Sequence, residues 1–299
     1  MDTNIRHRTL QMLVLIIAGE LVFSLPFHLA RFFRPSFLEL FNLSNTNLGD
    51  IFAVYGLTAM VSYFFGGLIA DKISARKLMT VSLLLTAFGG VYMSTLPDKL
   101  GMMILYGYWG MTTIFLFWAA MLKATREWGG NYTQGRAFGF LDGGRGLLAS
   151  IISAIAIIIF ASFLPIEINL ATTLQKLNGF RSIILFYSAL TAIAALLVWL
   201  FLPEPETAND NKQSSNFGKI IKVLSNRLVW LHAGIIICAY STYKGLDNTA
   251  LYAYEVLGMH EVDAAKLFTY GSLTRPIAAI LAGFLADRII ASRVIPVSY

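Results

Sequence analysis

Several ionisable side chains lie within long apolar segments of this sequence. A charged group in the interior of a bilayer is costly unless it faces a cavity or a partner, and such groups mark substrate or proton pathways. Arginine and lysine bind carboxylate and phosphate groups, and buried carboxyl groups can exchange protons. We therefore expect substrate-binding or coupling roles for the following residues: Glu20, His28, Arg31, Asp142, Arg145, Lys244, Asp247 and Arg275.

The first apolar segment carries a polar stripe that begins at Glu20. Ser24, His28 and Arg31 follow at i+4, i+8 and i+11, so the four side chains share one face of a helix. This face is expected to line a central cavity, where the Glu20 carboxyl could exchange protons. The alternatives are a structural hydrogen bond for Glu20 and a position at the membrane interface for His28 and Arg31.

A second pair of charges lies in a glycine-rich segment. Asp142 and Arg145 stand three residues apart, close enough on a helix to form an ion pair. Gly135, Gly139 and Gly143 form a row of small residues at four-residue spacing, which lets another helix approach closely. Arg145 either neutralises Asp142 structurally or binds an anionic substrate while Asp142 tunes it.

The remaining buried charges follow a long polar stretch. Lys244, Asp247 and Glu255 are expected on one helical face, and Lys244 is interpreted as a substrate or coupling residue. Arg275 precedes Pro276, whose ring should kink the helix near the middle of the membrane. The sequence leaves open whether Arg275 faces the cavity or pairs with Asp247 or Glu255.

Composition explains which elements must position these groups. The chain has 299 residues, of which 57% are hydrophobic and 13% are charged, whereas a soluble domain averages about 25% charged residues. Its mean hydropathy is +0.65. The net charge of +6 is interpreted as Lys and Arg anchors at a membrane surface, without a nucleic-acid partner. The sequence offers no metal-ligand cluster, nucleotide loop or nucleophile triad, so we expect neither a cofactor nor an enzyme.

Apolar segments long enough to cross a bilayer recur along the chain. We predict spans at 9–31, 50–70, 78–96, 101–123, 137–163, 181–202, 228–256 and 264–286. Residues 1–202 would form a six-helix bundle, 203–225 a cytoplasmic linker with an interfacial helix, and 226–299 an incomplete second bundle with helices seven and eight and the start of nine. The distribution of Lys and Arg places the N-terminus in the cytoplasm.

A short motif occurs at the end of the second span and again at the end of the eighth. The first copy comprises Gly67, Asp71, Lys72, Arg76 and Lys77, and the second comprises Gly283, Asp287 and Arg288. Glycine allows close approach of two helices. An aspartate at a helix C-terminus must find cations or the N-terminus of a facing helix. Each copy is therefore a candidate latch that forms in one conformation and breaks in another.

This repeated motif resembles that of the Major Facilitator Superfamily, in which it follows the second and the eighth helices of a fold with two six-helix halves. The first copy departs from the usual pattern, because Ser74 replaces the second glycine and the basic pair Arg76 and Lys77 arrives one residue late. The resemblance implies an all-α polytopic membrane protein that moves a small solute by alternating access. The stretch 226–247 is also similar to the seventh helix of organophosphate:phosphate antiporters. Their basic residue in helix one has no clear counterpart beside Phe27 and His28, so phosphate specificity is not carried over.

Three functions remain open on the sequence. The first is secondary transport of a small organic anion, such as a sugar phosphate or sugar acid, with or without proton coupling, in the inner membrane of a bacterium. The second is a truncated membrane protein that transports nothing, because the chain has fewer spans than the family fold. The third is a carrier of a neutral solute whose buried charges pair with one another.

Overall fold

The computed structural model describes residues 2–130, 132–165, 172–204, 225–245, 248–272 and 274–288. These residues form helices joined by short connections, with no strand among them. Five of the helical segments in the described part are long and apolar enough to cross a membrane: Arg6–Phe32, Asn45–Lys72, Lys99–Gly129, Gln134–Ala161 and Thr173–Phe201. The all-α polytopic membrane fold expected from composition is confirmed, while the expected number of spans stays a prediction.

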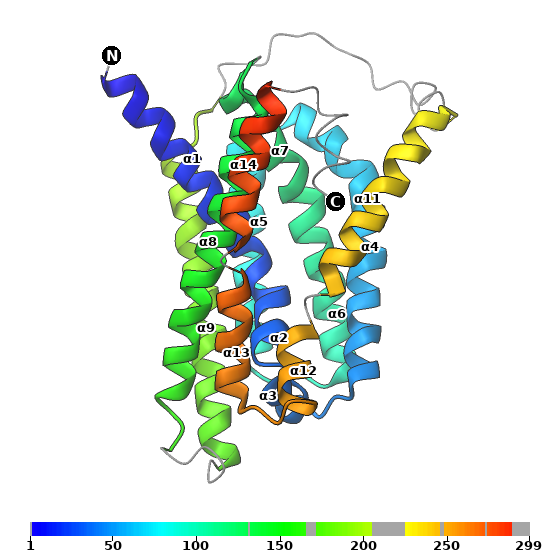
Figure 1. Ribbon diagram of the computed structural model, residues 1–299, viewed down its shortest axis with the longest axis vertical. Coiled ribbons are helices and arrows are strands. Elements are labelled where there is room, and N and C mark those ends of the chain that lie inside the picture. The colour runs from blue at the N-terminus through cyan, green and yellow to red at the C-terminus, as the bar shows by residue number, and fades with distance from the viewer. Residues whose placement is uncertain are drawn as a thin grey trace.

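The N-terminal part contains most of the long helices (Figure 1). Its elements are α1 (Asp2–Phe23), the π-helix η1 (Ser24–His28), α2 (Leu29–Phe32), α3 (Arg34–Leu40), α4 (Asn45–Lys72), α5 (Ala75–Met93), α6 (Lys99–Gly110), the π-helix η2 (Met111–Trp118), α7 (Ala119–Gly129), α8 (Gln134–Ala161) and α9 (Thr173–Phe201). Polar residues start several of them, because an N-cap side chain accepts a hydrogen bond from an otherwise unpaired backbone N–H. Ser44, Ser74, Asp98 and Thr172 cap α4, α5, α6 and α9 in this way.

The C-terminal part contains α11 (Arg227–Gly245), α12 (Thr249–Glu255), α13 (Glu261–Ser272) and α14 (Thr274–Arg288). The predicted spans 228–256 and 264–286 each correspond to two described helices, and residues 246–247 and 273 between these helices lie outside the described part. Pro276 lies in the first turn of α14, where a missing N–H is tolerated, and the expected kink there stays a prediction. Most of the predicted linker at 203–225 and the start of helix nine, at 289–299, lie outside the described residues.

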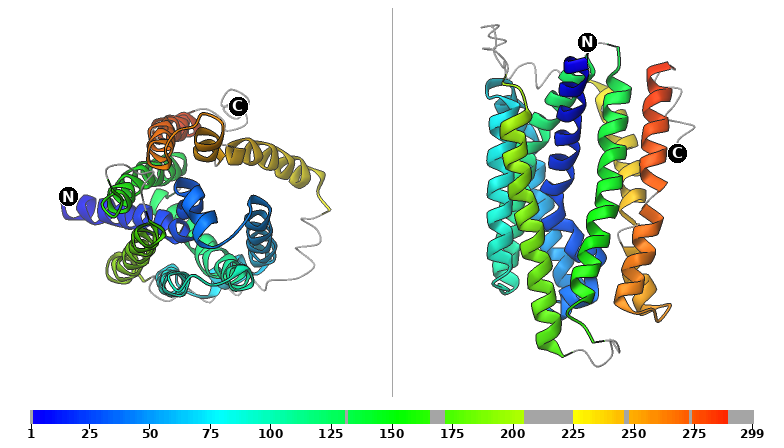
Figure 2. Two further views of the ribbon diagram at one scale, coloured as in Figure 1. Left: turned by 90° about the horizontal axis from the view of Figure 1, so that it is seen from below. Right: turned by 90° about the vertical axis from the view of Figure 1, so that its left-hand side faces the viewer.

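The helices form an elongated bundle with two distinct ends (Figures 1 and 2). We call the end that carries the N-terminus and the C-terminal ends of α4 and α14 the linker side, and the end that carries α3 and the start of α13 the far side. Helix α14 packs along α8 over most of its length. Helix α11 leans away from the rest of the bundle toward the linker side (Figure 1).

An aromatic cluster closes the far side of the N-terminal bundle. Phe33 precedes the short helix α3 and Phe37 lies within it, and both side chains are fully buried. Phe33 packs edge-on against Phe160 of α8, and Phe37 packs against Phe180 of α9. Edge-to-face aromatic pairs add to the stabilisation that burial provides. These contacts fix α3 to the N-terminal bundle.

Candidate functional site

The structure brings four of the predicted residues into one cluster near the centre of the bundle. His28 Nε2 lies 3.0 Å from Glu20 Oε1, and the two residues expose 1% and 4% of their surface. Arg145 Nε of α8 lies 3.4 Å from Glu20 Oε2, and Arg145 Nη1 lies 3.3 Å from Asp142 Oδ1. The Asp142 side chain is 51% exposed. A buried carboxyl–imidazole pair thus touches a guanidinium that also reaches an accessible carboxylate.

A local change of helix type shapes this cluster. Residues Ser24–His28 form a π-helical turn that contains Pro26, and such turns often occur at functional sites. Proline has no N–H to donate, so the α-helical ladder is interrupted there. Ser24 donates to the carbonyl oxygen of Leu21 at 2.7 Å and is buried. Of the predicted stripe, Ser24 thus bonds to the backbone, while Glu20 and His28 form a pair.

Aromatic rings at the end of α1 and in η1 contact two cations that come from α8 and α11. Arg145 lies over Phe23 at 5.7 Å and over Trp118 at 5.9 Å, measured from its guanidinium carbon to the ring centres. The Lys244 ammonium lies 4.9 Å from the ring centre of Phe27. The rings of Phe23 and Phe27 are neighbours, with centres 6.4 Å apart. Each cation is therefore held by one of two neighbouring rings, in a contact that favours a positive charge.

Tyr187 is a member of this region that the sequence did not suggest. Its ring packs edge-on against His28 with ring centres 5.5 Å apart, and the residue is fully buried. The Tyr187 hydroxyl has no hydrogen-bond partner in the part of the chain that the structure describes. Arg31 lies within electrostatic range of Tyr187. A single tyrosine within an apolar helix carries no sequence signal for such a position.

Two predicted residues cannot be placed in the cluster. Asp247 lies outside the described residues, and for Arg275 the description covers only its position as the second residue of α14. Their expected cavity or pairing roles therefore remain predictions.

The second copy of the repeated motif joins α14 to α8. Asp287 Oδ1 accepts a hydrogen bond from the backbone N–H of Gly135 at 2.7 Å, and Oδ2 accepts one from the N–H of Arg136 at 3.0 Å. Arg136 Nε lies 3.1 Å from the same carboxylate. Gly135 and Arg136 belong to the first turn of α8, where the helix dipole favours a negative charge. Asp287 thus meets both a cation and the N-terminus of a facing helix.

Glycines make this contact possible. A Cβ atom on Gly283 would come within 2.6 Å of the Gly135 carbonyl oxygen, and one on Gly139 would come within 3.0 Å of the Gly283 Cα. A Cβ atom on Gly143 would come within 2.9 Å of the carbonyl oxygen of Pro276. The predicted row of small residues on α8 is therefore the surface that receives α14.

The first copy of the motif stands in a different environment. A Cβ atom on Gly67 would meet nothing within 4 Å, and Asp71 and Lys72 are exposed. Arg76 and Lys77 pair with Glu204, which follows the end of α9, and Arg76 stacks on Trp199 of that helix. Hydrogen bonding to Lys77 and the nearby Arg76 charge lower the pKa of Glu204. In the second copy, Arg288 is also exposed.

Ser74 accounts for the departure of the first copy from the family pattern. It is the N-cap of α5, and its side chain accepts a hydrogen bond from the Lys77 N–H. The extra residue before the basic pair places Arg76 and Lys77 in the first turn of α5, within reach of Glu204. The basic pair therefore contacts the start of the predicted linker region in this structure.

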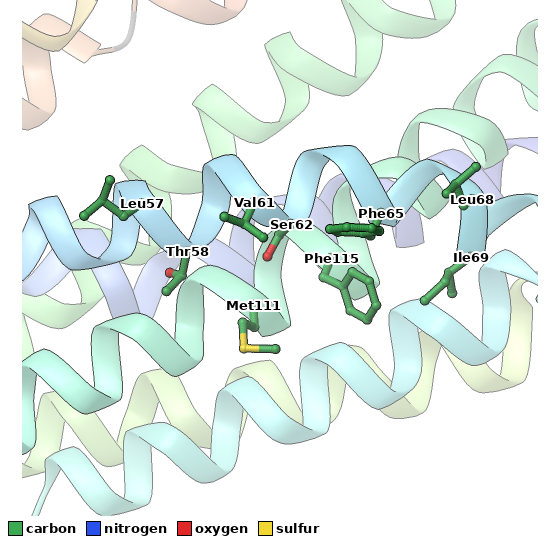
Figure 3. Close-up of a pocket in the computed structure, with 9 residues that line it drawn as sticks. All are labelled: Leu57, Thr58, Val61, Ser62, Phe65, Leu68, Ile69, Met111 and Phe115. Carbon is green, nitrogen blue, oxygen red and sulfur yellow. The ribbon is translucent and has the colours of Figure 1, made fainter. Parts of the chain in front are cut away.

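A groove of about 640 Å³ lies apart from the charged cluster. It runs between α4 and η2, and Figure 3 shows its lining side chains along one face of these helices. The lining residues are Leu57, Thr58, Val61, Ser62, Phe65, Leu68, Ile69, Met111 and Phe115. None of them is ionisable, so the groove does not offer the chemistry expected of the candidate site.

Apolar helices that enclose a buried charged cluster define a polytopic α-helical membrane protein. The family model described as Major Facilitator Superfamily matches residues 14–299, and the chain belongs to that family. Members of this family are secondary transporters rather than enzymes. The resemblance that the repeated motif indicated is thereby confirmed.

Curated relatives agree with this assignment. The chain is 26% identical over 271 residues to the inner membrane protein YqcE of Escherichia coli, covering 89% of this chain and 61% of the relative. It is 26% identical over 289 residues to the inner membrane protein YihN of the same organism, covering 93% of this chain and 65% of the relative. The chain thus spans less than two thirds of the length of each.

Proposed function

We propose that this protein is a secondary active transporter of a small organic anion in a bacterial inner membrane, with its N-terminus in the cytoplasm. The observation that carries the proposal is the placement of Arg145 and Lys244 over the adjacent rings of Phe23 and Phe27. Cations on two neighbouring rings favour a ligand with a carboxylate or phosphate group. A sugar acid or sugar phosphate has such a group.

The Glu20–His28 pair supports proton coupling. When Glu20 is ionised, its carboxylate faces Arg145 at 3.4 Å and opposes the binding of another anion there. When Glu20 takes up a proton, the guanidinium regains the capacity to bind the carboxylate or phosphate of a substrate. His28 at 3.0 Å can hold the proton in the alternative state. A proton and an anion would therefore enter the site together.

A second candidate function is the transport of a neutral solute. The observation that favours it is the contact of Arg145 with both Glu20 and Asp142, since two carboxylates can neutralise one guanidinium without any substrate. In that case Arg145 would be structural. Removing it would destabilise the bundle, but the binding of a neutral solute would not depend on its charge.

Uptake by proteoliposomes separates these possibilities. The purified chain would be tested with a radiolabelled sugar phosphate, a sugar acid and a neutral sugar, with and without an imposed proton gradient. We expect anion uptake that rises with an inward proton gradient and that falls at least about tenfold in Arg145→Ala and Lys244→Ala, the loss of a charged hydrogen bond being of that order.

Lys266→Ala serves as the matched control, because this lysine is exposed and pairs only locally with Asp263 at 3.0 Å. Anion uptake that is unchanged in both Arg145→Ala and Lys244→Ala would exclude the anion site. Uptake of the neutral sugar alone would support the second candidate. Failure to transport all three solutes by well-folded protein would favour a non-transporting chain.

A further inference from the structure

The far side of the molecule carries a set of hydrogen bonds between segments distant in sequence. Glu261, the first residue of α13, accepts from the Ser36 backbone N–H at 2.9 Å and from the Ser36 hydroxyl at 2.6 Å. These residues are 225 positions apart. Beside them, Arg34 donates to the side-chain oxygen of Asn248. Both oxygens of the Glu261 carboxyl are thus engaged by the N-terminal part.

Ser36 belongs to an element that cannot move independently of the N-terminal bundle. Phe37, the next residue of α3, is fully buried and packs against Phe180 of α9. On the C-terminal side, Glu261 begins a helix that contacts α8, where the Thr269 and Ser153 hydroxyls lie 3.3 Å apart. Separation of the two parts at the far side therefore requires the bonds between Ser36 and Glu261 to break.

The surroundings of Glu261 fix its charge preference. Burial raises the pKa of Glu261 above its ordinary value, opposed by the two hydrogen bonds from Ser36 and by the charge of Lys176. Glu39 adds to the raising effect, and it pairs with Lys176 at 2.7 Å. Arg34 also bonds to Asn45 at 3.1 Å. Desolvation is the largest of these effects, so the arrangement in which Glu261 contacts Ser36 favours the neutral carboxyl.

We propose that Ser36 and Glu261, supported by Arg34 and Asn248, form a latch that holds the far side closed and that is strengthened when Glu261 takes up a proton. A neutral carboxyl keeps both contacts, because its carbonyl oxygen accepts from the backbone N–H and its hydroxyl donates to the serine oxygen. It also avoids the cost of burying a charge. The latch rests on the alternating access of the proposed function.

The sign of the pH effect follows from linkage. When the far side opens, water surrounds Glu261 and its pKa returns toward the ordinary value, so the closed state binds the proton more tightly. Low pH therefore favours the closed state, and raising the pH favours opening. One titrating group changes the ratio of open to closed molecules by at most about tenfold for each pH unit.

Spin-label distance measurements test this latch without any transported solute. Labels on Thr46→Cys in α4 and Leu257→Cys between α12 and α13, both exposed, would report the separation at the far side in a Cys238→Ser background. We expect the longer distance to gain population as the pH is raised, because loss of the proton leaves a charge on the desolvated carboxyl. Glu261→Gln should keep the short distance throughout, because the amide reproduces both contacts without a charge. Glu261→Ala should show the longer distance throughout.

Two controls isolate the carboxyl group. A label pair on Thr46→Cys and Thr172→Cys, both in the N-terminal part, should give a distance that does not change with pH. His260→Gln should respond like the wild type, which excludes the adjacent exposed imidazole as the sensor. A pH response in Glu261→Gln equal to that of the wild type would overturn the proposal, as would a short distance in Glu261→Ala at high pH. If distances shift as expected but no anion is transported, the proposed cargo fails and the latch stands.

Discussion

The two copies of the repeated motif predict opposite effects of the same substitution. In Gly283→Ala, the new methyl group would lie 2.6 Å from the Gly135 carbonyl oxygen and 2.9 Å from the Gly139 Cα. Ordinary contact begins at about 3.4 Å, so α14 and α8 would have to separate by roughly half an ångström or more. Overpacking of this kind costs about 1–3 kcal/mol. A domain of 150–250 residues loses about 2–4 °C of Tm for each kcal/mol.

Gly67→Ala is the matched control, because a methyl group there meets nothing within 4 Å. Replacing glycine by alanine inside a helix stabilises the helix by up to about 1 kcal/mol. We therefore expect Gly283→Ala to lower the Tm of the purified protein by several degrees and Gly67→Ala to leave it unchanged or to raise it slightly. Thermal unfolding in one detergent, followed by the fluorescence of a label on Cys238, measures both. Equal stability of the two variants, or a greater loss in Gly67→Ala, would refute the described packing.

Three further substitutions test single contacts. Asp287→Asn removes the charge that meets two N–H groups and Arg136, and we expect a loss of about 1.5–3 kcal/mol in unfolding free energy, measured by denaturant titration. Tyr187→Phe removes a hydroxyl that has no hydrogen-bond partner among the described residues, so its Tm should equal or exceed that of the wild type, and a marked fall would contradict this. Glu204→Gln breaks exposed ion pairs only, so we expect no measurable change of Tm at neutral pH and no further change in high salt.

Much of the architecture could be predicted because its causes are local or repeated. Long apolar segments with few charges require membrane helices. The glycine and aspartate of the second motif copy required a closely packed helix and a positive partner, and α8 provides both through Gly139 and the Gly135 and Arg136 N–H groups. The i, i+3 spacing of Asp142 and Arg145 likewise indicated the observed pair.

Other features depend on distant segments or on backbone detail that one sequence does not reveal. The repeated motif predicted the same packing for both copies. In the structure Gly283 faces α8, whereas no atom lies within 4 Å of a Cβ atom built on Gly67. The contact between Ser36 and Glu261 joins polar residues outside the predicted spans, where neither charge cost nor periodicity gives a signal. The π-helical turn at Pro26 changes helix geometry without ending the apolar run.

The central claim is that the Glu20–His28 pair couples a proton to anion binding through Arg145, and calorimetry of anion binding tests it most directly. Binding of a sugar phosphate would be measured in two buffers with different heats of ionisation, for the wild type and for Glu20→Gln. We expect the wild type to take up about one proton for each anion bound, and Glu20→Gln to take up none while still binding the anion. Equal proton uptake by both proteins, or binding of the anion without proton uptake by the wild type, would contradict the account.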